Sequence, residues 1–161
     1  MPRSFFKRTT FVVGDAEAAM QFYTTVFGLR VWYDNVLEPD ADFPPAAPAG
    51  SRARLVILEG EDPVIGKLAF LQYLDAPPPA ARVIDRQRVR EGDTILVFET
   101  DDVDAVVARL PGTGATLHAG PKDWEVPSVS GEHRIELRTA SLFDPNGIYI
   151  EVGTKRAPPP P

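Results

Sequence analysis

The sequence repeats one order of secondary-structure elements, and this repeat constrains the fold more than any other feature. Strand-like residues 8–13 precede Asp15, and strand-like residues 95–100 precede Asp102, which lies 87 positions later (102 − 15). Each aspartate is a candidate N-cap, and apolar residues at helical spacing follow each one. Three further strand-like segments complete each half. A Rossmann sheet needs helices between nearly all its strands, so this order instead predicts an α+β fold. We expect two paired βαβββ modules whose curved mixed sheets enclose a cleft.

The predicted elements follow from apolar spacing and from glycine and proline positions. Gly28 suits the left-handed residue after the first helix, and the Pro111-Gly112 pair ends the second. We predict one domain over residues 1–156, with modules at about 6–75 and 93–153, a linker at 76–92 and a disordered tail at 157–161. The predicted strands are 8–13, 29–36, 54–59, 67–74, 94–100, 115–119, 134–142 and 148–152, the predicted helices 16–27 and 103–110, and 120–131 is predicted as a loop.

Composition excludes several classes of function. The chain has 161 residues, 43% of them apolar, which is enough for a core of its own. Its 17 basic and 23 acidic residues give a net charge of −6, which argues against nucleic acid and anionic membranes as partners. With no cysteine, disulfides, thiolate metal sites and thiol nucleophiles are excluded. There is no signal-peptide pattern and no apolar run of the roughly 20 residues that a membrane helix needs, so we expect a cytoplasmic protein.

The last predicted hairpin carries the most informative polar residue. Its turn, residues 144–147, reads Asp-Pro-Asn-Gly, in which proline sets one turn dihedral and glycine supplies a positive φ. In the strand that follows, Ile150 and Val152 share one face, and Tyr149 and Glu151 share the other. Glu151 therefore either meets water at an edge or meets a ligand, a cation or a metal in a cavity.

Three segments of the chain, in this order and spacing, form a recognisable set. They are the strand and helix start at residues 9–15 with Phe22-Tyr23 and residues 26–29, then Phe98 with residues 101–104, and finally residues 143–147 with Ile150-Glu151. Together they resemble the vicinal oxygen chelate superfamily, which includes glyoxalase I, extradiol dioxygenases, methylmalonyl-CoA epimerase and the bleomycin- and fosfomycin-resistance proteins. The resemblance spans residues 8–153 and implies the paired-module fold and, because many relatives are dimers, a homodimer. It leaves the reaction open, because one fold hosts many chemistries.

The resemblance also implies where a metal would bind. Metal-dependent members place a histidine on the first strand of each module and a glutamate on the last strand; these positions fall on Arg8, Ile95 and Glu151. The last strand of the first module, where a fourth ligand lies, offers Phe70 or Gln72. Arginine stays charged and cannot ligate a cation, and isoleucine has no donor atom. The sequence therefore keeps one usual ligand, disfavours a divalent metal, and indicates no other cofactor.

The resemblance points Arg8 and Glu151 into the same cavity, where a guanidinium–carboxylate pair would satisfy two buried charges. The alternative is that one or both reach water at the cavity mouth. A ligand carboxylate could also displace Glu151 from Arg8 and leave Glu151 as a base. If the Arg8–Glu151 pair is buried, removal of Arg8 alone should destabilise the fold more than removal of both charges. Arg8 and Glu151 are thus the candidate catalytic residues, and the candidate ligand-binding residues are Arg8, Thr10, Gln72, Val97, Tyr149 and Glu151.

Four other side chains are weaker candidates. His118 and His133 lie on or beside other strands of the second half, where surface positions or ordinary packing account for them better than a relocated metal site. Trp32 and Trp124 are each able to stack on an aromatic ligand, although an isolated tryptophan more often belongs to a core or a rim.

Three functions remain open from sequence. The first is a metal-free protein that binds a small molecule in its cleft, as resistance proteins do. The second is an enzyme of the lyase, isomerase or dioxygenase type with a non-standard site built on Glu151 and Arg8. The third is a non-catalytic assembly module.

Overall fold

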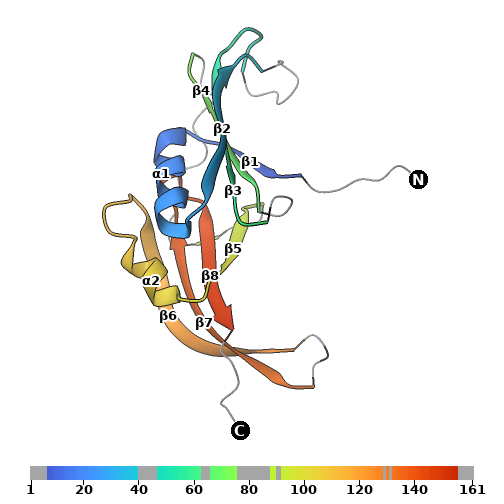
Figure 1. The fold of residues 1–161 in the computed structure, drawn as a ribbon, viewed down its shortest axis with the longest axis vertical. Coiled ribbons are helices and arrows are strands. Elements are labelled where there is room, and N and C mark those ends of the chain that lie inside the picture. The colour runs from blue at the N-terminus through green and yellow to red at the C-terminus, as the bar shows by residue number, and fades with distance from the viewer. Residues whose placement is uncertain are drawn as a thin grey trace, which may run out of the picture. The chain divides into compact units, whose positions relative to one another are not determined.

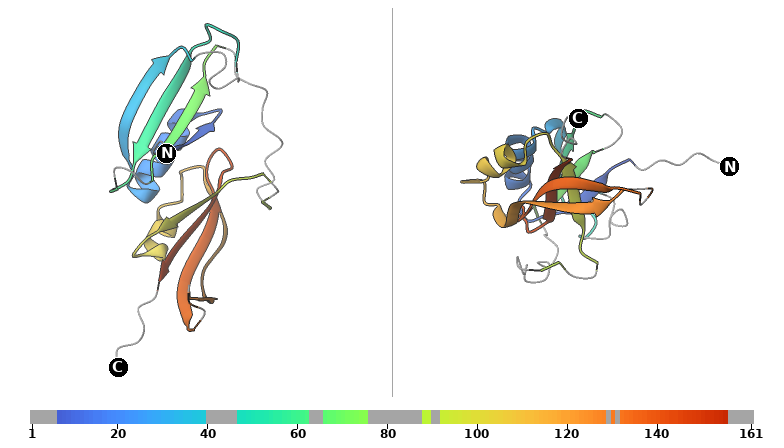
Figure 2. Two further views of the ribbon diagram at one scale, coloured as in Figure 1. Left: turned by 90° about the vertical axis from the view of Figure 1, so that its right-hand side faces the viewer. Right: turned by 90° about the horizontal axis from the view of Figure 1, so that it is seen from below.

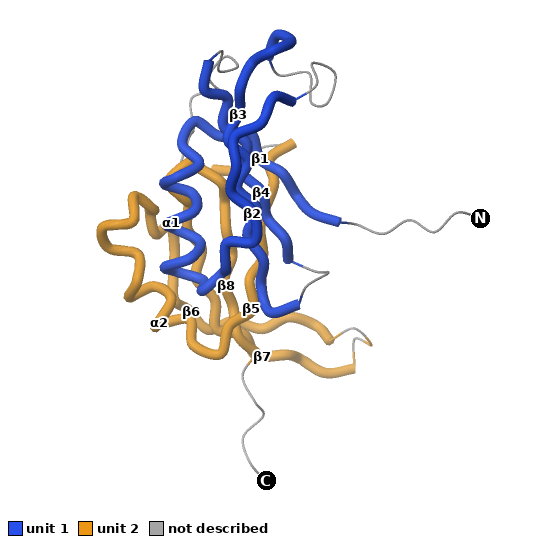
Figure 3. Tube along the Cα trace, turned by 45° about the horizontal axis from the view of Figure 1, so that its top comes forward, with its two compact units in different colours: residues 1–83 blue, residues 84–161 orange. Residues whose placement is uncertain are grey.

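The computed structural model describes residues 7–39, 47–62, 66–75, 88–89, 92–128, 130 and 132–155. The chain forms two compact units, residues 1–83 and residues 84–161 (Figure 3). Each unit has its own sheet and its own helix. The predicted tail and most of the predicted linker lie outside the described residues.

The first unit is a four-stranded mixed sheet with one helix on one face (Figure 1). The strands stand in the order β1-β4-β3-β2, and β1 runs parallel to β4 while the other pairs are antiparallel (Figure 2). The elements are β1 (Thr9–Val12), α1 (Ala16–Phe27), β2 (Arg30–Leu37), β3 (Ala53–Glu59) and β4 (Leu68–Tyr73).

The second unit repeats this topology. Its strands stand in the order β5-β8-β7-β6, and β5 runs parallel to β8. The two units therefore confirm the predicted α+β fold of two βαβββ modules. The elements are β5 (Ile95–Glu99), α2 (Val103–Ala108), β6 (Thr116–Pro127), β7 (Arg134–Phe143) and β8 (Tyr149–Lys155).

Both helices begin at the predicted aspartates. Asp15 accepts a hydrogen bond from the Ala18 N–H, and Asp102 accepts one from the Ala105 N–H, each at 2.9 Å. These bonds satisfy amides that the first helical turn leaves without partners. Helix α1 ends at Gly28, whose φ of +69° is the left-handed conformation that glycine adopts without strain. Asp15, Gly28 and Asp102 are thus confirmed as cap residues, whereas α2 ends at Ala108 with Arg109 as its C-cap, before the predicted Pro111-Gly112 pair.

An arginine on the third strand of each sheet order joins the helix to the sheet. In the first unit, Arg54 on β3 donates two hydrogen bonds to Asp34 on β2, at 2.8 and 2.7 Å, and lies 2.9 Å from Glu17 in the first turn of α1. In the second unit, Arg138 on β7 donates two bonds to Asp104 in the first turn of α2, at 2.7 and 2.8 Å, and one to Asp123 on β6, at 3.2 Å.

These two arginine bridges occupy equivalent positions. Arg54 pairs with Gln72 on β4, and Arg138 pairs with Thr154 on β8. Each arginine therefore lies on the helix side of its sheet, next to the equivalent central strand, which is β4 in the first unit and β8 in the second. Hydrogen bonds from Arg138 lower the pKa of Asp104, as those from Arg54 lower the pKa of Asp34. The internal repeat thus includes these arginine–carboxylate bridges, which the sequence analysis did not predict.

Strand β6 departs from the prediction. We expected a strand at 115–119 and a loop at 120–131, but β6 continues to Pro127. Gly120 and Pro121 lie within the strand and do not end it. A proline that cannot donate to a ladder is tolerated on an edge strand, and β6 is the edge of its sheet. Register shifts between Leu117 and Ala119 and between Ala119 and Lys122 accommodate the irregular segment.

The closing turn is built around a buried carboxylate. Asp144 is 0% exposed, and its Oδ1 accepts hydrogen bonds from the N–H groups of Asn146 at 2.9 Å and Ile148 at 2.8 Å. The Gly147 N–H donates to the Asp144 carbonyl at 2.9 Å. The predicted turn is therefore present, and it leads directly into β8. Among the described residues, none of the helices is long and apolar enough to cross a membrane.

Candidate functional site

Strand β8 separates an apolar side from a polar side in the second unit. Ile150 and Val152 are fully buried on the side that carries Arg138 and helix α2. Tyr149 and Glu151 alternate with them and are half-buried on the opposite side. This confirms the predicted alternation. We call the opposite side of this sheet the Glu151 face.

Strand register sets the neighbours of Glu151. Val97 on β5 lies beside it, and Ser141 on β7 lies on its other side. Ala119 on β6 pairs with Ser141 and continues the row. Val97 is 74% exposed, whereas Ser141 is 8% exposed. The carboxylate therefore stands between an exposed apolar side chain and a row of small residues.

Aromatic rings lie on one side of this row. Phe143 and Tyr149 pair across β7 and β8, with ring centroids 5.2 Å apart. The His118 ring contacts both in edge-to-face geometry, at 5.8 Å from Phe143 and 6.3 Å from Tyr149. His118 thus belongs to an aromatic cluster on the Glu151 face. This placement is the ordinary-packing alternative that the sequence left open.

A tryptophan lies on the other side. The next row pairs Gly153 with Thr139, and the Trp124 Nε1–H donates a hydrogen bond to the Thr139 Oγ1 at 2.8 Å. Gly153 has no side chain, so no side chain from β8 fills the space between Glu151 and this pair. The small row around Glu151 is therefore bordered by rings in both directions along the strands.

Within the second unit, the described residues give Glu151 no hydrogen-bond or ion-pair partner. The next row along the strands holds two exposed charges, Glu99 on β5 and Lys122 on β6. The Glu99 carboxylate lies 3.9 Å from the Lys155 ammonium, and neither Lys122 nor Lys155 is paired with Glu151. Exposed pairs of this kind contribute little because water screens them. A cation or a hydrogen-bond donor on Glu151 would therefore have to come from outside these residues.

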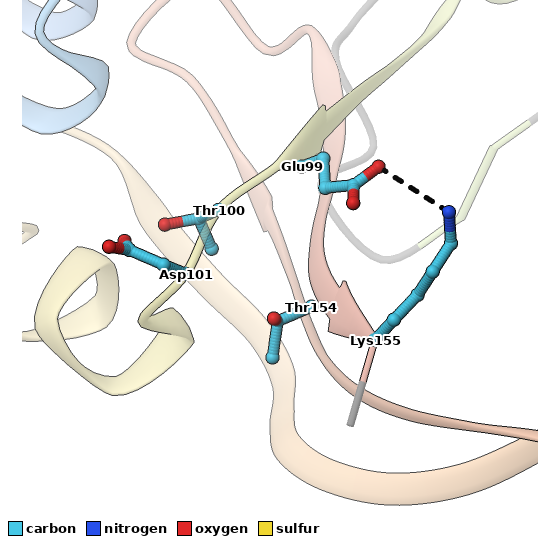
Figure 4. A pocket seen from close by; sticks show the side chains of 5 residues that line it. All are labelled: Glu99, Thr100, Asp101, Thr154 and Lys155. Atoms are coloured by element: carbon cyan, nitrogen blue, oxygen red, sulfur yellow. Dashed lines mark ion pairs between the residues drawn. The ribbon is translucent and has the colours of Figure 1, made fainter. Parts of the chain in front are cut away.

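An open hollow lies beyond Glu151 at the ends of β5 and β8. It measures about 360 Å³ and is lined by Glu99, Thr100, Asp101, Thr154 and Lys155 (Figure 4). Glu151 does not line it. Figure 4 shows Glu99 reaching toward Lys155, while Thr100, Asp101 and Thr154 extend elsewhere. Because none of its lining residues is apolar and its carboxylate–ammonium pair is already formed, this hollow is a weaker candidate binding site than the Glu151 face.

The corresponding face of the first unit is different. Thr10 pairs with Ala69 as Val97 pairs with Glu151, so Ala69 is the structural counterpart of Glu151. Ala69 is 0% exposed. An apolar cluster of Ala53, Leu71 and Tyr73 covers this side of the sheet. The two modules thus share a topology, but at the position of Glu151 the first module has an alanine instead of a carboxylate.

Two residues offered by the sequence lie on the helix side of the first sheet. The Gln72 Oε1 accepts a hydrogen bond from the Ala16 N–H at 3.0 Å, and the Phe70 ring stacks on Tyr23 with a centroid distance of 5.0 Å. Strand parity therefore separates Gln72 from Thr10, and the structure does not bring Gln72 to the predicted face. Its amide instead helps to satisfy the start of helix α1.

Arg8 lies directly before β1, and its Nε–H donates a hydrogen bond to the Thr10 Oγ1 at 3.2 Å. Arg8 and Thr10 are thus brought together, as the sequence predicted from strand parity. Glu151, Tyr149 and Val97 are likewise brought together in the second unit. The Arg8–Glu151 ion pair joins residues of two different units and stays a prediction.

The donor set does not fit the superfamily's divalent metal. Arg8 cannot ligate, and Ile95 and Ala69 have no donor atoms, which leaves Glu151 as the single ligand. The described residues contain no group of three or more histidine, aspartate or glutamate side chains placed to hold an ion. No step of the function proposed below passes through a metal.

The comparisons with known proteins agree with this architecture. Residues 6–152 match the Glyoxalase/Bleomycin resistance protein/Dioxygenase superfamily. The chain belongs to this superfamily. The resemblance seen in the sequence is thereby confirmed, and the chain is a divergent member that lacks the usual ligand histidines. No curated protein sequence matches the chain.

Solved structures share the fold of this superfamily member. A glyoxalase family protein from Bacillus cereus has a TM-score of 0.72 at 17% identity, with 94% of each chain covered. An antibiotic-binding protein from a Streptomyces species has a TM-score of 0.57 at 23% identity, with 97% of this chain and 99% of that one covered. A fosfomycin resistance protein from Listeria monocytogenes, solved with Mn(II) and sulfate, has a TM-score of 0.54 at 12% identity, with 95% and 93% covered.

Sequence reasoning missed part of the Glu151 face. Ser141, Ala119 and Thr139 carry no distinctive motif, and only strand register reveals them as neighbours of Glu151 and Trp124. The parity of Tyr149 and Glu151 was readable from the sequence. Which residues of β7 and β6 stand opposite them was not, because the register of the closing hairpin and the irregular pairing of β6 with β7 had to be known first.

Proposed function

We propose that this protein binds a small organic molecule on the Glu151 face, with Glu151 as its polar anchor and without the metal used by other members of the superfamily. One observation carries the proposal. A half-buried carboxylate stands among exposed apolar and aromatic side chains, and the described residues of its own unit give it no partner. Such a group gains from any ligand that supplies a hydrogen-bond donor or a positive charge.

The surrounding side chains supply the apolar part of the interaction. Ile95 is 47% exposed and Val97 is 74% exposed, so a ligand seated there would remove their surface from water. Full burial of one such side chain contributes about 1.5–3 kcal/mol, and a contiguous exposed apolar patch is typical of an interaction site. The antibiotic-binding protein and the fosfomycin resistance protein show that the same fold hosts small-molecule recognition, which supports this reading.

The test is a fragment screen by amide NMR on ¹⁵N-labelled protein. We expect binders that carry an amine or hydroxyl group to shift the amides of Val97, Ser141 and Glu151. Glu151→Gln, which keeps the shape and removes the charge, should weaken amine binding about tenfold, because a charge-assisted bond becomes a neutral one. Glu136→Gln, an exposed residue on the other face of β7, is the matched control and should leave binding unchanged.

Three outcomes would contradict the proposal. Binding that shifts other surfaces would move the site away from Glu151. A shift in melting temperature or stoichiometric uptake with Zn, Ni, Mn or Fe, abolished by Glu151→Gln, would restore a metal. Chemical conversion of a bound fragment, lost in Glu151→Gln and Arg8→Met, would favour the enzymatic alternative with these two residues as polar catalysts.

We further propose that the protein is a cytoplasmic homodimer. The support is the superfamily assignment together with an acidic, cysteine-free composition. Sedimentation equilibrium at micromolar concentration measures the mass directly, and a monomer of 17.6 kDa would contradict the dimer.

A further inference from the structure

Trp124 and Trp32 are held in different ways. The Nζ of Lys67 lies 4.1 Å from the centre of the Trp32 ring, so one face of that indole is already covered by a cation–π contact. Trp124 instead uses its Nε1–H for the 2.8 Å bond to Thr139, and no described ring or cation packs against it. It is 46% exposed. Trp124 therefore combines a satisfied polar atom with an unoccupied ring.

Strand register places this ring near Glu151. Thr139 lies two residues from Ser141 along β7, and Ser141 is the cross-strand partner of Glu151. Two residues along a strand and one strand across correspond to roughly 8 Å between the side chains of Thr139 and Glu151. Gly153, the cross-strand partner of Thr139, leaves the intervening surface without a side chain from β8.

We propose that Trp124 is the ring-binding part of the site and that Thr139 positions it. This rests on the proposed function of the Glu151 face. The ligand class is then a planar aromatic molecule that carries an amine, with the ring stacked on Trp124 and the amine on Glu151. Because Thr139 fixes the indole before binding, the side chain loses little further conformational freedom when a ring stacks on it.

Three probes separate the two contacts. 2-(2-Naphthyl)ethylamine carries both a ring and an ammonium, 3-(2-naphthyl)propionate exchanges the ammonium for a carboxylate, and 2-cyclohexylethylamine exchanges the aromatic ring for an aliphatic one. We expect the naphthyl amine to bind tightest and to shift the indole Nε1–H signal of Trp124. Trp32→Phe assigns that signal by removing the other indole resonance.

The decisive variant is Thr139→Val, which keeps the side-chain shape and removes the acceptor for Trp124. We expect it to lower the affinity ratio of the naphthyl amine to the cyclohexyl amine about three- to tenfold, the value of an aromatic pair beyond its buried area. Thr154→Val, a matched change on the helix side of β8, should leave the ratio unchanged. Trp124→Leu should remove the preference for the naphthyl ring, with far-UV circular dichroism confirming the fold.

Failure of this inference and failure of the proposed function give different results. Naphthyl amine binding that depends on Glu151 but is unaffected by Thr139→Val and Trp124→Leu overturns the role of Trp124 and leaves the Glu151 site intact. No Glu151-dependent binding of any of the three probes overturns both.

Discussion

Replacement of Asp144 with alanine should be among the most damaging single substitutions in the second unit. The carboxylate is 0% exposed and accepts two backbone N–H groups, those of Asn146 and Ile148, at 2.9 and 2.8 Å. Alanine cannot accept either bond, and the two N–H groups remain part-buried in the folded turn. Each donor left unsatisfied costs about 1–3 kcal/mol, so Asp144→Ala should lower the free energy of unfolding by about 3–5 kcal/mol.

Asp144→Asn separates the geometry from the charge. Asparagine keeps an Oδ1 acceptor in the same place, so it should lose about 1–2 kcal/mol. Asp101→Ala is the control because Asp101 is an exposed aspartate of the same unit; surface changes of this kind stay within about 0.5 kcal/mol.

Urea unfolding provides the measurement. In a Trp32→Phe background the remaining tryptophan, Trp124, reports on the second unit alone. A loss of 3–5 kcal/mol is a large part of the total stability of a typical domain, about 5–15 kcal/mol, so the midpoint shift should be unmistakable. A loss below about 1 kcal/mol for Asp144→Ala would refute the claim that these two bonds hold the hairpin.

Two further predictions concern charged side chains of the first unit. Hydrogen bonds from Arg52 lower the pKa of Asp75 from 3.8 to about 2, so this aspartate stabilises the fold above about pH 4, and the contribution is lost as the pH falls through about 2. Asp75→Asn should therefore lower the urea midpoint at pH 6 and have a much smaller effect near pH 2, where about half of the Asp75 carboxyl is protonated; an equal loss at both pH values would contradict the pair. Arg54→Lys keeps the charge but loses the two-pronged bond to Asp34, and should cost about 1 kcal/mol in chemical denaturation. Arg30→Lys should cost measurably less, because the Arg30 side chain is 69% exposed and its pair with Glu59 is 3.8 Å long.

Local sequence signals predicted much of the fold because their physical causes are local. Helix α1 was predicted at residues 16–27, and the structure has Ala16–Phe27, since Asp15 caps one end and Gly28 ends the other. The closing turn was readable for the same reason: Asp144 bonds amides two and four residues away. In both cases the interacting groups are only a few residues apart in the sequence, so the sequence alone shows that they meet.

The errors arose where an element depends on a distant strand. Gly120 and Pro121 indicate a loop, but the edge position of β6 tolerates them, and that position is a property of the sheet. The orientation of Gln72 depends on the sheet in the same way. The resemblance placed a fourth ligand on the last strand of the first module, which offers Phe70 or Gln72, whereas the register of β1 with β4 puts Ala69 beside Thr10 and turns Gln72 toward helix α1.

Periodicity and cap residues in the sequence by themselves determined the order of elements in each module and the face on which Glu151 and Tyr149 lie, because these signals are fixed by short-range geometry. The superfamily came from a resemblance carried by three segments, and that resemblance places Arg8 and Ile95 at the positions of the usual histidines. Only the tertiary structure decided that Ser141 and Val97 flank Glu151, and that Trp124 is bonded to Thr139, two residues from Ser141 along β7. A shift of one residue in strand pairing reverses every side chain, and that pairing is set by contacts between segments far apart in the chain.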